Sequence, residues 1–120
     1  MDTPKIFESE YRFCLILWEQ EPVEGARLVE LCRERLGWSK STTYTVIRRL
    51  AQRGVLKNEN SVVTSLVSRE MAEKAEMDAL VERTFAGSLP AFVAAFARRE
   101  DLTEKEIDCL RQMIREYEEK

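Results

Sequence analysis

The segment of residues 38–54 carries the start signal, the periodicity and the stop signal of one complete helix. Ser39 can accept a hydrogen bond from a backbone N–H of the first turn, and Gly54 can adopt the left-handed conformation that ends a helix. At about 100° per residue, the side chains divide into two faces. The apolar face holds Thr43, Val46, Ile47 and Leu50, and the polar face holds Ser41, Thr45, Arg48 and Gln52, with Tyr44 at the border. The segment therefore predicts an amphipathic helix whose two ends are both specified locally.

The outward face of this helix is rich in residues that form helices poorly. Thr42, Thr45 and Tyr44 are β-branched or aromatic, and such residues favour a helix less than Ala, Glu or Lys do. An ordinary surface helix would also have a polar face, but it would not need this composition. Hydroxyl groups and a guanidinium on an outward face can pair with the edges of DNA bases. We therefore interpret the segment as a binding face.

Charge is distributed unevenly along the chain. The overall balance is 19 basic against 22 acidic residues, which is not that of a protein coated with positive charge. Residues 67–120 contain 13 acidic and 9 basic residues, whereas residues 35–58 contain no acidic residue. The basic residues of that acid-free segment are Arg35, Lys40, Arg48, Arg49, Arg53 and Lys57. This pattern predicts attraction of phosphate groups around the amphipathic helix and a different role for the acidic remainder.

Composition argues against several kinds of site. Cys14, Cys32 and Cys109 are odd in number and far apart, and the chain has no His, so we expect no disulfide framework, no metal site and no cofactor. The cysteines are interpreted as small buried residues, with redox sensing as the alternative. No Gly-rich phosphate loop, Gly-x-Ser-x-Gly motif or histidine base is found, so an enzyme is not expected. No apolar run approaches the roughly 20 residues that span a bilayer, and no signal-peptide pattern is found, so we expect a cytoplasmic protein with no membrane partner.

Further elements are predicted around this helix, and together they indicate a mainly α fold with a small β-hairpin. The expected elements are helices over residues 7–19 and 24–36 and strands over residues 55–57 and 62–66, with a turn at residues 58–61. Two helices, a polar-faced helix and a hairpin occur in this order in a winged helix-turn-helix domain, whose third helix enters the major groove of DNA. This domain is predicted over residues 1–67. The hairpin either touches the DNA backbone as a wing or only covers the core.

Residues 68–120 predict three helices with too few apolar residues for a core of their own. The helices are expected from Ser68 to about Phe85, from Leu89 to about Arg99, and from the capping box at Thr103 and Glu106 onward. Their apolar side chains need burial, which a small helical tail can obtain by pairing with a second copy. The residues expected at this homodimer interface are Leu80, Phe85, Phe92, Phe96, Leu110 and Ile114. Packing of the tail onto its own domain is the alternative.

A set of short sequences spread along the chain matches a known pattern. They are Glu8-Ser9-Glu10-Tyr11 to Leu17-Trp18, Trp38-Ser39 with Ser41-Thr42, Thr45-Val46-Ile47-Arg48-Arg49-Leu50 with Gly54, Ser65-Leu66-Val67, and Glu100-Asp101-Leu102-Thr103 with Glu106-Ile107 and Leu110. In order and spacing, apart from a shorter wing, the set resembles the penicillinase repressor family of BlaI/MecI-type transcriptional regulators. The resemblance implies a homodimeric repressor of an inverted-repeat, double-stranded operator. It also implies relief by a protease, linked to a membrane sensor of β-lactams, that cuts the dimerisation segment.

The chain departs from this family pattern at several positions. The family's scissile bond aligns with Ala95–Phe96, the candidate cleavage site, where Ala95 stands in place of the family's Asn. The C-terminal cysteine cluster of the copper-responsive relatives is missing, so copper sensing by that route is not expected. The wing lacks the basic and aromatic residues of its relatives, and Ser41 and Tyr44 replace the Lys and Arg of some members. A different operator preference is therefore open.

The residues of the acid-free segment are expected to divide between two kinds of DNA contact. Base edges are expected to be read by Ser41, Thr42, Tyr44, Thr45 and Arg48. Phosphates are expected to be bound by Lys40, Arg49, Arg53 and Lys57. Arg49 has an alternative role, in which it forms an internal ion pair with an acidic residue of the first helix. A winged helix that binds another protein, without sequence-specific DNA binding, is the alternative function.

Overall fold

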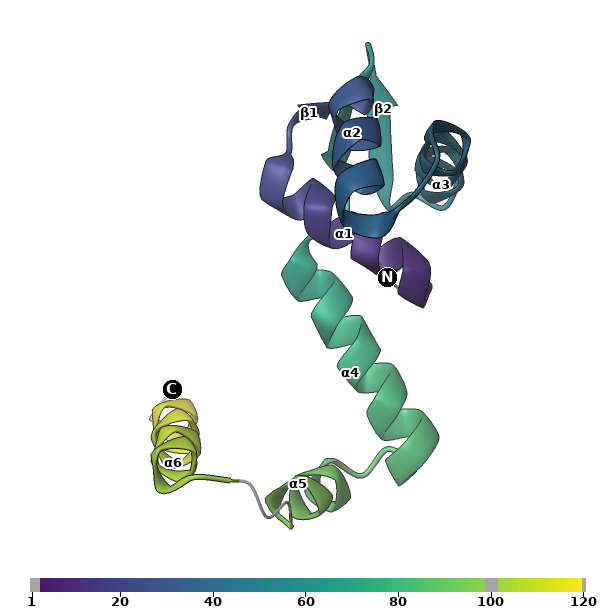
Figure 1. Ribbon diagram of the computed structural model, residues 1–120. Coiled ribbons are helices and arrows are strands. Elements are labelled where there is room, and N and C mark those ends of the chain that lie inside the picture. The colour runs from purple at the N-terminus through teal and green to yellow at the C-terminus, as the bar shows by residue number, and fades with distance from the viewer. Residues whose placement is uncertain (1–2, 99–101, 120) are drawn as a thin grey trace. The chain divides into compact units, whose positions relative to one another are not determined.

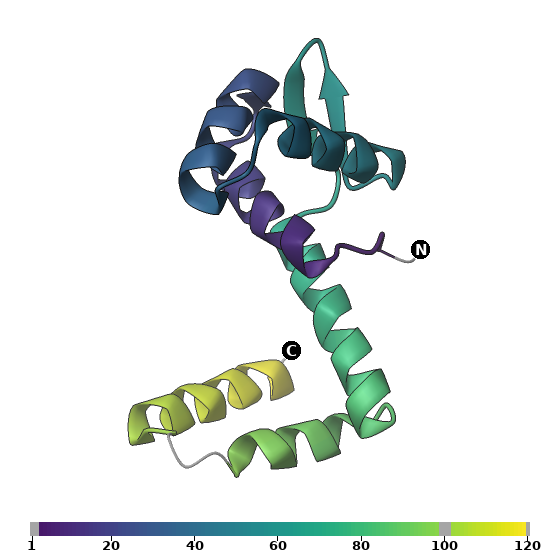
Figure 2. The ribbon, with the colours of Figure 1, turned by 45° about the vertical axis from the view of Figure 1, so that its right-hand side comes forward.

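The computed structural model describes residues 3–98 and 102–119. Its elements are α1 (Glu8–Gln20), β1 (Val23–Glu24), α2 (Gly25–Leu36), α3 (Lys40–Gln52), β2 (Leu56–Glu59), β3 (Val62–Ser65), α4 (Arg69–Phe85), α5 (Leu89–Ala97) and α6 (Glu104–Glu118), shown in Figures 1 and 2. The chain divides into two units, Met1–Met77 and Asp78–Lys120, so the division lies inside α4. The expected helix end at Arg99, the family residues Glu100 and Asp101, and Lys120 lie outside the described residues. The expected fold class, a winged helix followed by C-terminal helices, is confirmed.

Local signals in the sequence define most of the helix ends. Ser39 is the N-cap of α3, and its hydroxyl accepts a hydrogen bond from the Thr42 backbone N–H at 3.1 Å. Gly54 follows this helix with a φ of 82°, in the left-handed region that glycine adopts without steric cost. At the start of α6, Thr103 and Glu106 form the predicted capping box. These predictions succeeded because a cap depends on residues that lie next to each other in the chain.

The hairpin is confirmed, and it belongs to a larger sheet than the sequence suggested. The strands β2 and β3 pair antiparallel, with Leu56 opposite Ser65. In the turn between them, Asn60 and Ser61 have φ values of 53° and 66°. Positive φ at both central residues is typical of a two-residue type I′ hairpin turn, so the turn is shorter than expected. In addition, β1 pairs antiparallel with β3 and makes the strand order β1-β3-β2. A strand of two residues has no periodicity, which is why β1 was missed.

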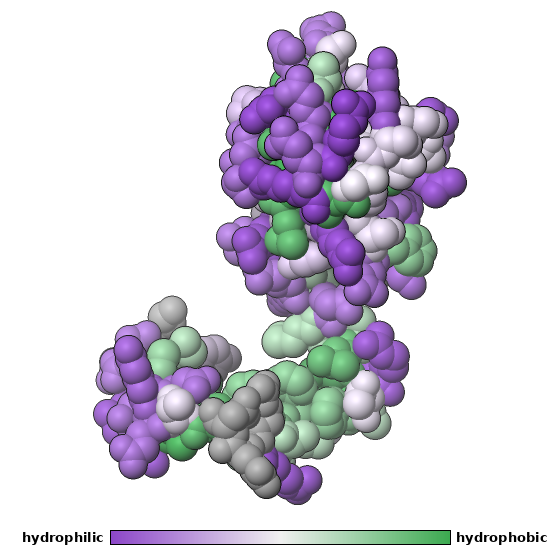
Figure 3. Space-filling view, viewed as in Figure 1, coloured by the Kyte–Doolittle hydropathy of each residue, from purple (hydrophilic) through white to green (hydrophobic). Residues whose placement is uncertain are grey.

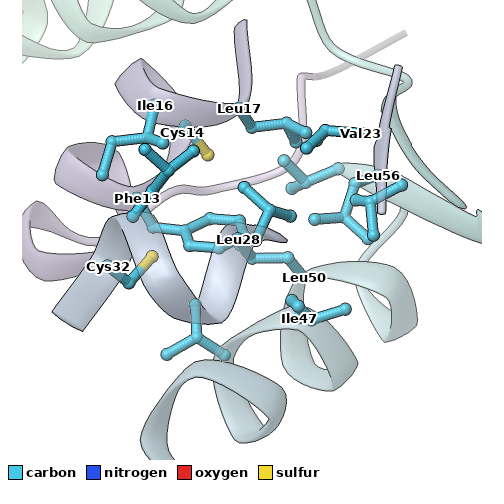
Figure 4. Close-up of a cluster of buried hydrophobic side chains, with 14 of the residues drawn as sticks. Phe13, Cys14, Ile16, Leu17, Val23, Leu28, Cys32, Ile47, Leu50 and Leu56 are labelled. Carbon is cyan, nitrogen blue, oxygen red and sulfur yellow. The ribbon is translucent and has the colours of Figure 1, made fainter. Parts of the chain in front are cut away.

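The core of the N-terminal unit lies between the three helices and the sheet, and every one of these elements contributes to it. Phe13 and Leu17 of α1 are 0% exposed, and Leu28 of α2 and Leu50 of α3 are equally buried. Figure 4 shows their side chains converging with those of Val23, Ile47 and Leu56. The ring of Trp38, just before α3, stacks on Phe13 with centroids 6.2 Å apart. The segment that leads into α3 is therefore held against α1.

The three cysteines differ in their surroundings. Cys14 and Cys32 are buried in the core, whereas Cys109 on α6 is exposed, which corrects the expectation that all three are buried. Burial raises the pKa of the Cys14 thiol to about 12, with a smaller contribution from the nearby Glu10 carboxylate. Burial also raises the pKa of the Cys32 thiol. Both core thiols are therefore kept protonated at neutral pH.

We expect a thiol reagent at pH 8 to modify Cys109 alone in the folded protein, because the thiolate is the reactive form and only Cys109 is accessible. Mass spectrometry of the labelled protein checks the expectation, with labelling in denaturant as the control that reveals all three thiols. Rapid labelling of Cys14 under native conditions would contradict the described packing.

The second unit leaves most of its apolar side chains at the surface. Val81 is the buried hydrophobic residue among its described residues, and neither α5 nor α6 buries a side chain. Phe85 and Phe92 contact each other edge to face, with centroids 5.5 Å apart. Figure 3 shows hydrophobic side chains gathered over α5 and the end of α4. Among the described residues, no helix on its own has the length and apolar composition needed to cross a membrane. The helices α4 and α5, bent by 89° at the break between them, have that length and composition only as a pair.

Candidate nucleic-acid interface

The helix α3 has the two faces that its sequence predicts. Thr43, Val46, Ile47 and Leu50 are buried, whereas Ser41 and Arg48 are exposed on the other side. The hydroxyl of the buried Thr43 donates to the Ser39 carbonyl at 3.2 Å, so a polar group on the apolar face has a partner. The packing of α3 therefore presents the polar face outward.

The hydroxyl-bearing residues of this face keep hydrogen-bonding capacity for an external ligand. Ser41 and Thr42 are exposed and Thr45 is partly exposed. The Thr42 hydroxyl oxygen accepts from the Ser39 hydroxyl at 3.0 Å, as part of the helix cap. Because a hydroxyl has one proton to donate in addition to its lone pairs, Thr42 can still donate to a base.

Tyr44 occupies a different position from the other predicted base-contacting residues. Its ring is partly buried and packs against the core. A Cβ atom placed on Gly25, at the start of α2, would lie 3.4 Å from Tyr44 Cε1, and the Gly25 N–H donates to the Ser61 carbonyl at 2.9 Å. Tyr44 thus fills the junction of α2, α3 and the hairpin turn. Its contact with a base remains a prediction.

The four cations predicted to bind phosphates separate into three groups. Lys40 and Arg49 are exposed, and neither forms an ion pair among the described residues. Lys57 in β2 lies 3.8 Å from the carboxylate of Glu59, at the exposed surface. Arg53 is paired with Glu10 of α1. Electrostatic attraction of phosphate would therefore come mainly from Lys40, Arg48 and Arg49.

An internal ion pair with the first helix, the alternative role considered for Arg49, is formed by Arg53. An acidic residue of α1 does pair with a cation near the end of α3, but the cation is Arg53 rather than Arg49. Glu10 lies 8% exposed, and its other oxygen accepts from the Phe7 backbone N–H at 2.9 Å. This carboxylate holds the Arg53 guanidinium, so Arg53 has a partner within the fold, and its contact with phosphate remains a prediction.

Sequence reasoning missed Glu10 and Glu21 as structural residues. Glu10 stands three and seven residues before Phe13 and Leu17, a spacing that places it on the buried face of α1 and could have identified it. Glu21 follows α1 and accepts hydrogen bonds from the Ser65 backbone N–H at 2.7 Å and from the Ser65 hydroxyl. No local pattern indicates this second contact, because its partners are far apart in the chain.

The residues predicted for the homodimer interface lie on all three C-terminal helices. Phe96, Leu110 and Ile114 are 37%, 39% and 58% exposed, and Leu80, Phe85 and Phe92 are partly buried within the second unit. Ala95 and Phe96, the candidate cleavage site, lie inside α5. The expected apolar surface is therefore present, and what covers it is a question of function.

Comparison with known proteins covers nearly the whole chain. The family model described as "Penicillinase repressor" matches residues 6–116. The Methicillin resistance regulatory protein MecI of Staphylococcus aureus (strain Mu50) is 26% identical over 116 residues, which cover 93% of this chain and 94% of that protein. The Penicillinase repressor of Bacillus licheniformis is 21% identical over 118 residues, covering 95% and 92%. The resemblance is confirmed: this winged-helix protein belongs to the penicillinase repressor family.

Proposed function

We propose that the protein is a transcriptional repressor that binds an inverted-repeat operator as a homodimer, with α3 in the major groove. The carrying observation is the outward face of α3, which combines hydroxyl groups with Arg48 and lies within a segment, residues 35–58, that has no acidic residue. Membership of a repressor family supports the same conclusion. Protein binding by the winged helix alone would not require this acid-free surface.

The proposal divides the contacts by what they read. Ser41, Thr42 and Thr45 face base edges, where threonine methyl groups can meet thymine methyls. Arg48 pairs with guanine, and a good bidentate pair is worth about 1–3 kcal/mol of discrimination. Lys40 and Arg49 bind phosphates, which position the helix without carrying sequence information. The wing contributes little, because Glu59 lies beside its Lys57.

The C-terminal helices supply the second half of the proposal. Apolar residues of α5 and α6 are exposed in the single chain, and a second copy can bury them. Two copies related by a two-fold axis would present two α3 helices to two half-sites. In this proposal the repressor is relieved when the dimer is lost, for example through a sensor-linked protease that cuts at Ala95–Phe96. Loss of the dimer lowers the affinity for the operator because the two winged-helix domains are then no longer tethered to each other.

Selection of duplexes from a random-sequence DNA library tests the proposed function. The purified complete chain is expected to enrich an inverted repeat whose half-sites are about 10 base pairs, or a multiple of that distance, apart. A duplex of the same composition in scrambled order is the control. Enrichment of no sequence, with weak binding to both duplexes, would reject the operator and favour the protein-binding alternative.

We expect Arg48→Ala and Lys40→Ala to change different properties of DNA binding. Replacing Arg48 removes a base contact, so discrimination between the selected and scrambled duplexes falls by about 1–3 kcal/mol. Replacing Lys40 removes a phosphate contact, so both duplexes bind more weakly and the salt slope, the change in log affinity with log salt concentration, becomes shallower by about one unit. Fluorescence anisotropy at several salt concentrations measures both quantities.

Lys105→Ala is the matched control for charge removal, because Lys105 is an exposed cation in the first turn of α6. It is expected to change neither the salt slope nor the discrimination. Identical effects of Arg48→Ala and Lys40→Ala would contradict the division into base and phosphate contacts.

A further inference from the structure

The end of the helix α3 is attached to the start of α1 through a buried charged group. Glu10 is one of two buried polar or charged residues among the described residues, the other being Thr43. One of its carboxylate oxygens accepts from the Phe7 N–H at 2.9 Å, and the other accepts from the Arg53 guanidinium. Residues 10 and 53 are far apart in the chain, so this pair is a tertiary connection.

Arg53 is held on several sides. It directly follows α3 as its C-cap, and its side chain is 30% exposed. The guanidinium lies over the Phe7 ring, 5.1 Å from the ring centroid, a cation–π arrangement. Its Nε is buried without a hydrogen-bond partner. Arg53 is therefore held by the Glu10 carboxylate and by the Phe7 ring, although not all of its N–H donors have a partner.

The energetics of such a pair favour a role in geometry over a role in stability. Withdrawing two charges from water costs free energy that their attraction only partly repays, and well-packed apolar residues in the same place are often equally stabilising. What an apolar pair does not reproduce is the directional link between one carboxylate and one guanidinium. Orientation matters for α3, because the helix angle decides which bases its outward face reaches.

We propose that Glu10 and Arg53 are positioning residues for DNA recognition: their ion pair sets the orientation of α3, and Arg53 itself does not contact phosphate. The inference rests on the proposed function. It assigns Arg53, a cation in the acid-free segment, to internal support, and it makes Glu10 a determinant of operator discrimination although it lies on another helix.

The double replacement Glu10→Met with Arg53→Met tests the proposal. Methionine is of similar length and adapts to irregular packing, so the variant is expected to keep the circular dichroism spectrum and the urea midpoint of the native protein. Its discrimination between the duplex selected by the native protein and the scrambled duplex is expected to fall about tenfold, as for one lost bidentate base contact. Its salt slope is expected to stay unchanged.

The control is Glu19→Met with Arg35→Met, which removes another ion pair between two helices. Arg35 lies 3.2 Å from Glu19, and both side chains are exposed. The change in composition is the same and α3 is not involved, so discrimination should remain native. A second variant, Arg53→Lys, keeps the charge but loses the planar fork, and we expect it to lose about threefold or more in discrimination even if the double variant does not fold.

The outcomes separate the two proposals. Native discrimination in the folded double variant, or in Arg53→Lys if the double variant is unfolded, overturns the positioning role. A salt slope shallower by about one unit in the double variant also overturns it, because Arg53 would then be a phosphate contact. If the native protein itself does not distinguish the selected from the scrambled duplex, the proposed function fails, and the positioning role fails with it.

Discussion

A chain ending after Leu89 is expected to sediment as a monomer and to bind the selected inverted repeat about 10²–10⁴-fold more weakly than the complete chain. The truncation removes α6 and nearly all of α5, and with them the exposed Phe96, Leu110 and Ile114. It leaves the core of the N-terminal unit in place, because the residues of that core lie between Phe13 and Ala72. Without the second copy, the gain from binding two half-sites on one ligand is lost, which accounts for the size of the effect.

Two measurements separate loss of the dimer from damage to α3. A duplex with one half-site is expected to bind the truncated chain and the complete chain with similar affinity. A chain ending after Tyr117 keeps the apolar side chains of α6 and should remain dimeric. A truncated chain that still sediments as a dimer would show that residues 1–89 are sufficient for the interface, and would contradict the proposal that dimerisation requires α5 and α6.

Phe13→Ala is expected to lower the free energy of unfolding by about 3–5 kcal/mol, the usual cost of removing a buried aromatic ring. Phe13 is 0% exposed, and it contacts the centre of the core as well as Trp38 next to the N-cap of α3. The variant therefore loses both apolar burial and a contact that supports the start of α3. Urea denaturation followed by circular dichroism measures the effect, at one protein concentration because the proposed dimerisation would make stability depend on concentration.

Leu66→Ala is the comparison for this variant, because the Leu66 side chain is 54% exposed just after β3. Surface replacements are usually within about 0.5 kcal/mol of the native protein, and we expect the same here. Equal losses for Phe13→Ala and Leu66→Ala would contradict the described core.

Most of the helices and the two faces of α3 could be predicted from neighbouring residues. The Ser39 cap, the Gly54 stop and the Thr103–Glu106 capping box each act within one turn of the chain, so their signals are complete in the sequence. The helical periodicity of apolar and polar residues likewise identified the buried Val46, Ile47 and Leu50. The exposed Arg48 was found by the same argument.

The errors have a common cause in contacts between distant residues. Cysteine is a residue type that is usually buried, but Cys109 lies on α6, a helix with no fully buried residue. The strand β1 exists because Val23 pairs with Val63, forty residues later in the chain. Tyr44, by contrast, was placed at the border of the two faces of α3, and its ring is partly buried there against the core.

By itself, the sequence determined the class of fold, the position and polarity of α3, and the family, because these depend on periodicity, on local caps and on residues in a fixed order. Tertiary structure alone decided which cation near α3 pairs with an acidic residue of α1. In the sequence, Lys40, Arg49 and Arg53 are all basic residues without a neighbouring acidic residue. Arg53 differs from the other two because the fold places Glu10 next to it. The physical reason is that the contacts of a charged side chain depend on which oppositely charged group lies beside it. For Arg53 that group is 43 positions away in the chain.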